Sequence, residues 1–180
     1  MLVRKIAVFS FTILIGLNTQ TASGFFGSNN IESVGDYLQV ILPAYALGMA
    51  VQEEGWEGVR QFGYSFGAMQ LTVELMKQTI NAERPDGSDN RSFPSGHTAA
   101  AFSGATFIHK RYGWQRAVVP YMLAGFAGYS RVHANKHYWH DVVAGAAISS
   151  LLTWTLTSRY SNYQVSASPT SVSLGFRTDF

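Results

Sequence analysis

Three short clusters of polar residues in this chain carry side chains that could bind and transfer a phosphoryl group. In the first, Lys77 lies seven residues before Arg84, which is followed by Pro85. Seven residues advance an α-helix by about two turns, so both cations are expected on one helix face. Two neighbouring cations repel unless an anion lies between them. Taken alone, such a pair is more often part of a solvated helix face.

The second cluster, Pro94-Ser95-Gly96-His97, follows a polar loop and opens an apolar segment. The start of a helix offers free backbone N–H groups and a positive dipole end, which together bind phosphate. Ser95 is expected to cap the helix, Gly96 to let a ligand approach the backbone, and His97 to lie beside the ligand. An ordinary serine cap followed by an incidental histidine fits the same residues.

The third cluster places Ser130-Arg131 before His137 and Asp141. Asp141 is expected near the start of a helix, where the dipole stabilises a carboxylate. It could accept a hydrogen bond from one ring nitrogen of His137 and leave the other as an oriented nucleophile or base. A purely structural histidine–aspartate pair is the alternative.

Together the three clusters resemble the phosphatidic acid phosphatase type 2 superfamily, which includes class A acid phosphatases and vanadium haloperoxidases. The family pattern, Lys-x6-Arg-Pro, then Pro-Ser-Gly-His, then Ser-Arg-x5-His-x3-Asp, is met without departure in residue or spacing. The resemblance covers about residues 35–160. It implies an all-α fold, a compact helical bundle.

The resemblance also implies a role for each residue of the pattern. His137 would attack phosphorus and form a phosphohistidine, Asp141 would orient and stabilise it, and His97 would protonate the leaving oxygen and then activate water. The phosphate-binding residues would be Lys77, Arg84, Ser95, Gly96 and Arg131. No metal and no cofactor are expected, because side chains supply the cations.

Other functions fit parts of the pattern. His133 and His140, with His137 and Asp141, have spacings that could bind zinc, but a zinc site leaves Lys77, Arg84 and Arg131 unexplained. A vanadate-dependent haloperoxidase would use the same pocket. A non-catalytic phosphate- or lipid-binding envelope protein is the alternative from another class.

Helices separated by glycine and proline are expected to hold these residues. The expected ranges are 36–51, with Asp36 as its N-cap and a kink or break at Pro43, 56–83, 95–110, 114–129 and 141–160. The residue before a proline avoids the α region, so the second helix should end at Arg84. Alternating apolar residues after Val165 predict a small β-hairpin.

Composition and charge indicate an exported protein. Charged residues make up only 13% of the 180 residues, and there is no cysteine. Residues 1–24 have the basic start, short apolar run and small-residue end of a signal peptide. Residues 25–162 then form the helical phosphatase domain and 163–180 a tail. We expect a location in the periplasm or on the periplasm-facing cell envelope.

The expected partner is a phosphorylated small molecule or a lipid phosphate, and no nucleic acid. Between Asn90 and His140 the chain has no Asp or Glu, six Lys or Arg, and all five histidines, which suits an anionic ligand. Uncharged runs of 13 to 17 residues are short for membrane spans. They favour a soluble bundle, or one that rests on a membrane surface, over a membrane-crossing protein.

Overall fold

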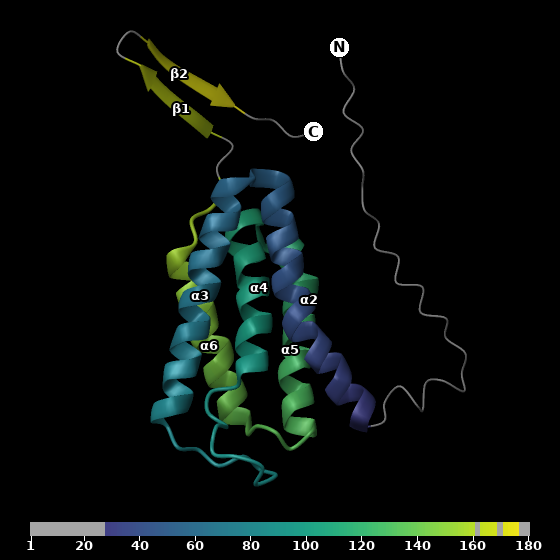
Figure 1. Ribbon diagram of the computed structural model, residues 1–180. Coiled ribbons are helices and arrows are strands. Elements are labelled where there is room, and N and C mark those ends of the chain that lie inside the picture. The colour runs from purple at the N-terminus through teal and green to yellow at the C-terminus, as the bar shows by residue number, and fades with distance from the viewer. Residues whose placement is uncertain (1–27, 161–162, 169–170, 177–180) are drawn as a thin grey trace, which may run out of the picture.

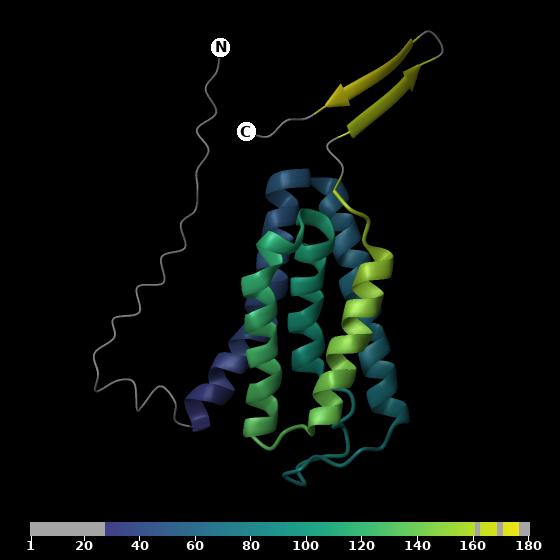
Figure 2. The same cartoon turned by 180° about the vertical axis from the view of Figure 1, so that it is seen from behind.

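A helix of small residues, α4 (Gly96–Tyr112), lies at the centre of the fold in the computed structural model, which describes residues 28–160, 163–168 and 171–176 (Figure 1). Four helices surround it: α2 (Ser28–Glu54), α3 (Trp56–Thr79), α5 (Trp114–His133) and α6 (Trp139–Leu156) (Figure 2). Ala99, Ala101 and Ala105 of α4 are fully buried. Small side chains let the neighbouring helices approach α4 closely. The predicted all-helical bundle is confirmed.

Gly104 of α4 lies close against the backbone of α2. A Cβ atom at Gly104 would lie 2.7 Å from the carbonyl carbon and oxygen of Leu42 and 2.8 Å from the nitrogen of Pro43. Helix α2 runs through Pro43 and does not end there. Because Gly104 has no side chain, the backbones of α2 and α4 lie in direct contact at this point.

We predict that Gly104→Ala lowers the free energy of unfolding by about 1–3 kcal/mol, because overpacking forces rigid backbone apart. The matched control is Gly125→Ala in α5, where an added Cβ would meet nothing within 4 Å. The control is expected to be neutral or slightly stabilising, since alanine favours a helix over glycine. The midpoint of thermal unfolding measures both changes, and equal midpoints for the two variants would contradict the packing described here.

One apolar cluster of the core lies at the end of the bundle where α2 joins α3. The ring of Phe62 lies 5.4 Å from that of Phe66 and 5.2 Å from that of Phe107, the second pair nearly perpendicular. Met49 and Ile108 pack in the same buried cluster. Two further buried clusters continue the core toward the opposite end.

The helix boundaries differ by up to eight residues from those expected, and two of the differences bear on the site. Helix α2 begins at Ser28, so Asp36 lies inside it and does not cap it. Helix α3 ends at Thr79 instead of Arg84 because Ile80 adopts an extended conformation and the Ala82 carbonyl then accepts a hydrogen bond from the Ser92 N–H at 2.9 Å. The prediction that Lys77 and Arg84 share one helix face was therefore wrong.

After α6 the chain forms an antiparallel hairpin of β1 (Tyr163–Ser168) and β2 (Ser171–Phe176), in the segment where a hairpin was predicted. Val165 pairs with Leu174 in its register. The predicted signal peptide, residues 1–24, lies outside the described residues.

Candidate active site

The three polar clusters meet at one end of the bundle, at the connections from α3 to α4 and from α5 to α6 (Figures 1 and 2). Lys77 comes from the last turn of α3 and Arg131 from the last turn of α5. His97 and Asp141 lie in the first turns of α4 and α6, and His137 lies just before α6. Residues far apart in the sequence thus converge because neighbouring helices run in opposite directions.

His137 and Asp141 are buried beside each other, with a hydroxyl group between them. Asp141 is fully buried and His137 is 3% exposed. The Nδ1 atom of His137 lies 3.6 Å from Asp141 Oδ2 and 3.4 Å from Ser92 Oγ, and the Ser92 hydroxyl donates to that carboxylate oxygen. Asp141 Oδ2 also accepts a hydrogen bond from the Tyr138 N–H at 2.9 Å. Nδ1 therefore faces the carboxylate, and Nε2 is the nitrogen left for a ligand.

The environment of His137 keeps its imidazole neutral. Burial, followed by the positive charges of Lys77 and Arg84, lowers the pKa of His137 to about 4, and the negative charge of Asp141 only partly opposes this. A neutral imidazole has a free lone pair, so the group can act as a nucleophile at neutral pH.

Asp36 of α2 joins Arg131 to His97. Its Oδ1 atom accepts a hydrogen bond from Arg131 Nη1 at 2.7 Å and lies 2.9 Å from His97 Nε2. Arg131 is 3% exposed, and its Nη2 donates to the backbone carbonyl of Glu32 at 2.6 Å. The guanidinium is thus held from one side by α2, next to the histidine expected to act as the acid.

The loop between α3 and α4 fixes the other two cations. Lys77 Nζ donates to the Arg91 carbonyl at 2.6 Å, and Arg84 Nε donates to Asp89 Oδ1 at 2.7 Å. Arg84 therefore reaches the site from the loop, not from α3. An ion pair of Lys136 with Asp86 at 2.7 Å ties the same loop to the connection before α6.

Ser95 and Gly96 occupy the start of α4, as the sequence predicted. Ser95 is the N-cap, and its Oγ accepts hydrogen bonds from the Thr98 N–H at 3.5 Å and the Thr98 hydroxyl at 2.9 Å. An added Cβ on Gly96 would lie 3.7 Å from Lys77 Cε, so the helix start lies against that lysine side chain. The first N–H groups of α4 and the ammonium group are thus neighbours, which favours an anion.

Of the two histidines added by the zinc interpretation, one lies away from the site carboxylate and one contacts it. His133 stacks on Tyr129. His140 Nε2 lies 3.1 Å from Asp141 Oδ1, its ring stacks on Tyr138, and 68% of its side chain is exposed. Across the described residues, no group of three or more His, Cys, Asp or Glu side chains could hold a metal ion. The positions of the side chains therefore give the zinc interpretation no support.

Asp36 and Ser92 belong to the site but were missed as functional residues. Asp36 was expected to be a helix cap, and its contact with Arg131 spans 95 positions of the chain. Ser92 lies two residues before Pro94, and only its nearness to the Pro-Ser-Gly-His cluster could have drawn attention to it. Both hold other side chains of the site in place. Such a role requires no particular spacing in the sequence, so a search for motifs does not find it.

Comparison with known sequences agrees with the three clusters. The sequence model of the PAP2 superfamily matches residues 58–164. A lipid A 1-phosphatase of Porphyromonas gingivalis is 34% identical in an alignment of 140 residues that covers 71% of this chain but 31% of that protein. A lipid A 4'-phosphatase of Helicobacter pylori is 29% identical in an alignment of 145 residues that covers 74% of this chain and 73% of that protein.

Solved structures share the helical arrangement. The crystal structure of LpxE from Aquifex aeolicus matches with a TM-score of 0.58 at 23% identity, over 69% of this chain and 84% of that one. A transmembrane PAP2-type phosphatidylglycerolphosphate phosphatase from Bacillus subtilis matches with a TM-score of 0.53 at 24% identity, over 80% of this chain and 78% of that one. At these identities the likeness concerns the fold.

Proposed function

The chain belongs to the PAP2 superfamily, and we propose that it is a phosphatase that hydrolyses a lipid phosphate through a phosphohistidine on His137. The observation that carries the proposal is the convergence of a neutral, oriented histidine with three cations and a second histidine at one end of the bundle. The cations would also serve a binding site, but the two histidines have tasks in phosphoryl transfer that binding alone does not require.

In the first step, Nε2 of His137 attacks phosphorus, and the bond from phosphorus to the substrate oxygen breaks. His97 donates a proton to the leaving oxygen, and the negative charge of the bound phosphate stabilises the protonated imidazole before the transfer. Asp141 holds Nδ1 protonated and stabilises the positive charge that forms on the imidazole. In the second step, His97 takes a proton from water, the water oxygen attacks phosphorus, and inorganic phosphate leaves as the P–N bond breaks.

The charge on the transferring phosphoryl group is stabilised by Lys77, Arg84 and Arg131, together with the N–H groups at the start of α4. Fixed cations and dipoles are the main source of catalysis in phosphoryl transfer. Because these side chains supply positive charge from three directions, we propose that the reaction needs no metal ion.

A lipid substrate is supported by the lipid A phosphatases among the relatives and by the surface of the bundle. Large apolar side chains are exposed on every outer helix, for example Val40, Leu71, Met122 and Leu151. Charged residues of the outer helices lie toward the two ends, and the uncharged runs between them are roughly 20 Å long at 1.5 Å per residue. Such a surface favours a bundle embedded in a membrane, against the sequence-based preference for a soluble or surface-bound one.

Two further features support this placement. Within the described residues, one helical stretch, Asn30–Glu53, is long and apolar enough to span a membrane. Exposed aromatic side chains gather near the two ends of the bundle, with Trp56, Trp114 and Trp154 at one and Tyr129 and Trp139 at the other, as in interfacial aromatic belts. The signal-like start of the sequence supports an active site that faces the periplasm.

The function is tested with the full chain purified in detergent. Hydrolysis of p-nitrophenyl phosphate and of a lipid phosphate monoester is expected in the presence of a chelator, with inhibition by vanadate, which mimics the five-coordinate phosphorus. Strict dependence on added zinc or magnesium would overturn the proposal. So would halide oxidation by the vanadate-loaded protein without any phosphatase activity.

The pH dependence follows from the lowered pKa of His137. The nucleophile is the neutral imidazole, so the acid limb of activity is expected where the pH falls through about 4 and His137 binds a proton. An ordinary histidine would lose activity near pH 6.5. We predict an acid limb of kcat/KM near pH 4 after correction for the substrate phosphate, whose second pKa is about 6. A limb that remains near pH 6.5 would contradict this assignment.

A further inference from the structure

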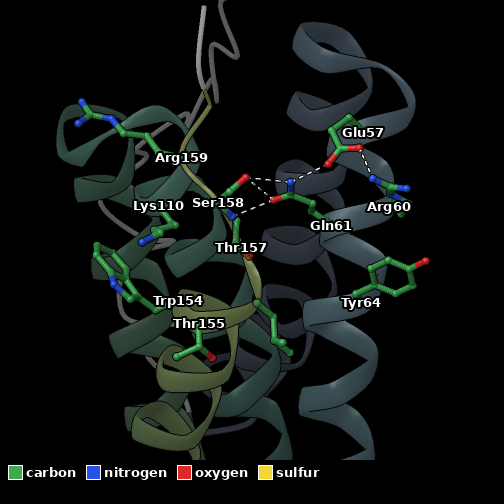
Figure 3. A pocket seen from close by; sticks show the side chains of 11 residues that line it. Glu57, Arg60, Gln61, Tyr64, Lys110, Trp154, Thr155, Thr157, Ser158 and Arg159 are labelled. Atoms are coloured by element: carbon green, nitrogen blue, oxygen red, sulfur yellow. Dashed lines mark hydrogen bonds and ion pairs between the residues drawn. The ribbon is translucent and has the colours of Figure 1, made fainter. Parts of the chain in front are cut away.

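A polar groove lies at the end of the bundle opposite the active site. Its volume is about 700 Å³, and it opens between the first turns of α3 and the segment that follows α6. In Figure 3, Lys110, Trp154 and Arg159 lie on one side and Arg60 and Tyr64 on the other. We call this space the far groove.

The floor of the far groove is fixed by hydrogen bonds between chain segments distant in sequence. Gln61 Oε1 accepts hydrogen bonds from Arg111 Nη1 at 2.7 Å and from the Ser158 N–H at 2.9 Å (Figure 3 shows the second). Arg111 Nη1 also donates to the Ser158 carbonyl at 2.9 Å, and Arg111 is only 4% exposed. The groove is therefore preformed, and a ligand would not have to order its floor.

The charges of the far groove favour an anion. Three cations, Arg60, Lys110 and Arg159, line it with one carboxylate, Glu57, which is paired with Arg60 at 2.6 Å. In the described part of the chain, neither Lys110 nor Arg159 has a carboxylate partner; Lys110 instead lies 4.3 Å from the ring centre of Trp154. Two cations thus stay available to a ligand on the Trp154 side.

The position of the groove selects the kind of anion. It lies at the edge of the uncharged band of the bundle, beside the exposed rings of Tyr64 and Trp154 and the exposed side chain of Leu151. In a bilayer this is the level of the lipid headgroups, where aromatic rings gather and basic pockets between helices bind anionic lipids. The adjacent apolar surface suits acyl chains.

We propose that the far groove binds the headgroup phosphate of an anionic phospholipid in the leaflet opposite the active site, with Lys110 and Arg159 as its cationic partners. The inference rests on the proposed membrane placement but on no step of the hydrolysis. The bound lipid is a ligand of the bundle and not a substrate, because the groove contains no histidine.

The test uses the full chain in a neutral detergent and compares wild type with K110Q/R159Q. Thermal unfolding midpoints are titrated with phosphatidylglycerol, phosphatidylcholine and inorganic phosphate. The matched control is Arg116→Gln, which removes an exposed cation at the same end of the bundle but outside the groove. Unfolding midpoints without lipid report whether each variant folds, independently of any phosphatase activity.

We expect phosphatidylglycerol to raise the thermal unfolding midpoint of wild type and of Arg116→Gln alike. Its affinity for K110Q/R159Q should be at least roughly tenfold lower than for wild type. Phosphatidylcholine should have little effect, and inorganic phosphate should act equally on all three proteins. The proposal is overturned if K110Q/R159Q keeps the full response to phosphatidylglycerol or if phosphatidylcholine acts as strongly. A response to inorganic phosphate that disappears in K110Q/R159Q would also overturn it, since the groove would then bind a free anion.

Discussion

Replacement of His137 with alanine is expected to reduce turnover on the order of 10⁴-fold or more, because loss of a covalent nucleophile removes the two-step route altogether. His137 is the buried imidazole whose Nδ1 faces Asp141 and Ser92, so no neighbouring group can take over the attack from the same position. The fold should survive, since the imidazole makes no hydrogen bond shorter than 3.4 Å to a side chain.

The measurement is a single-turnover experiment with labelled substrate, quenched in alkali, in which a phosphohistidine survives. Wild type should carry label on the protein and His137→Ala should not. His133→Ala is the matched control, because His133 is an exposed histidine that stacks on Tyr129. Unchanged turnover in His137→Ala would refute the assignment of the nucleophile.

Asp141→Asn is expected to lower kcat on the order of 10⁴-fold, as does the same change in the orienting carboxylate of a histidine-containing triad. The asparagine keeps the size of the side chain in a fully buried position but loses the negative charge. The imidazole can then no longer be held with its proton on Nδ1, and the positive charge formed on attack is left unstabilised.

The kinetic constants distinguish this effect from loss of binding: kcat should fall while KM stays within a few-fold. Asp86→Asn is the control, since Asp86 pairs with Lys136 in the loop and does not contact His137. Ser92→Ala should have a smaller effect than Asp141→Asn, because it removes the hydroxyl group but leaves the carboxylate. A raised KM with normal kcat in Asp141→Asn would contradict the orienting role.

Much of the site could be predicted because its residues stand in short segments. Pro94-Ser95-Gly96-His97 spans the start of α4, and Arg131…His137…Asp141 spans the end of α5 and the start of α6, so local spacing determines where their side chains begin. The five helices were likewise predicted from apolar segments between glycines and prolines. Their ends were less accurate, because helix ends depend on contacts outside the helix.

The contacts that the sequence did not predict are those between distant segments. Helix α3 ends before Ile80 because the Ala82 carbonyl accepts a hydrogen bond from the Ser92 N–H. The helix therefore ends several residues before Pro85, on which the predicted end was based. The position of Asp36 depends on how α2 packs beside the ends of α4 and α5. The sequence of a helix does not show which buried arginine its carboxylate will pair with, because that depends on how the helices pack.

The bridging carboxylate of Asp36 has a consequence for the end of the proposed catalytic cycle. Arg131 and His97 are donors that a phosphate group would use, and one oxygen of Asp36 contacts both. Orthophosphate formed by the reaction must therefore compete for these donors with a carboxylate of the chain itself. We expect this competition to weaken the binding of orthophosphate, and so inhibition by the product.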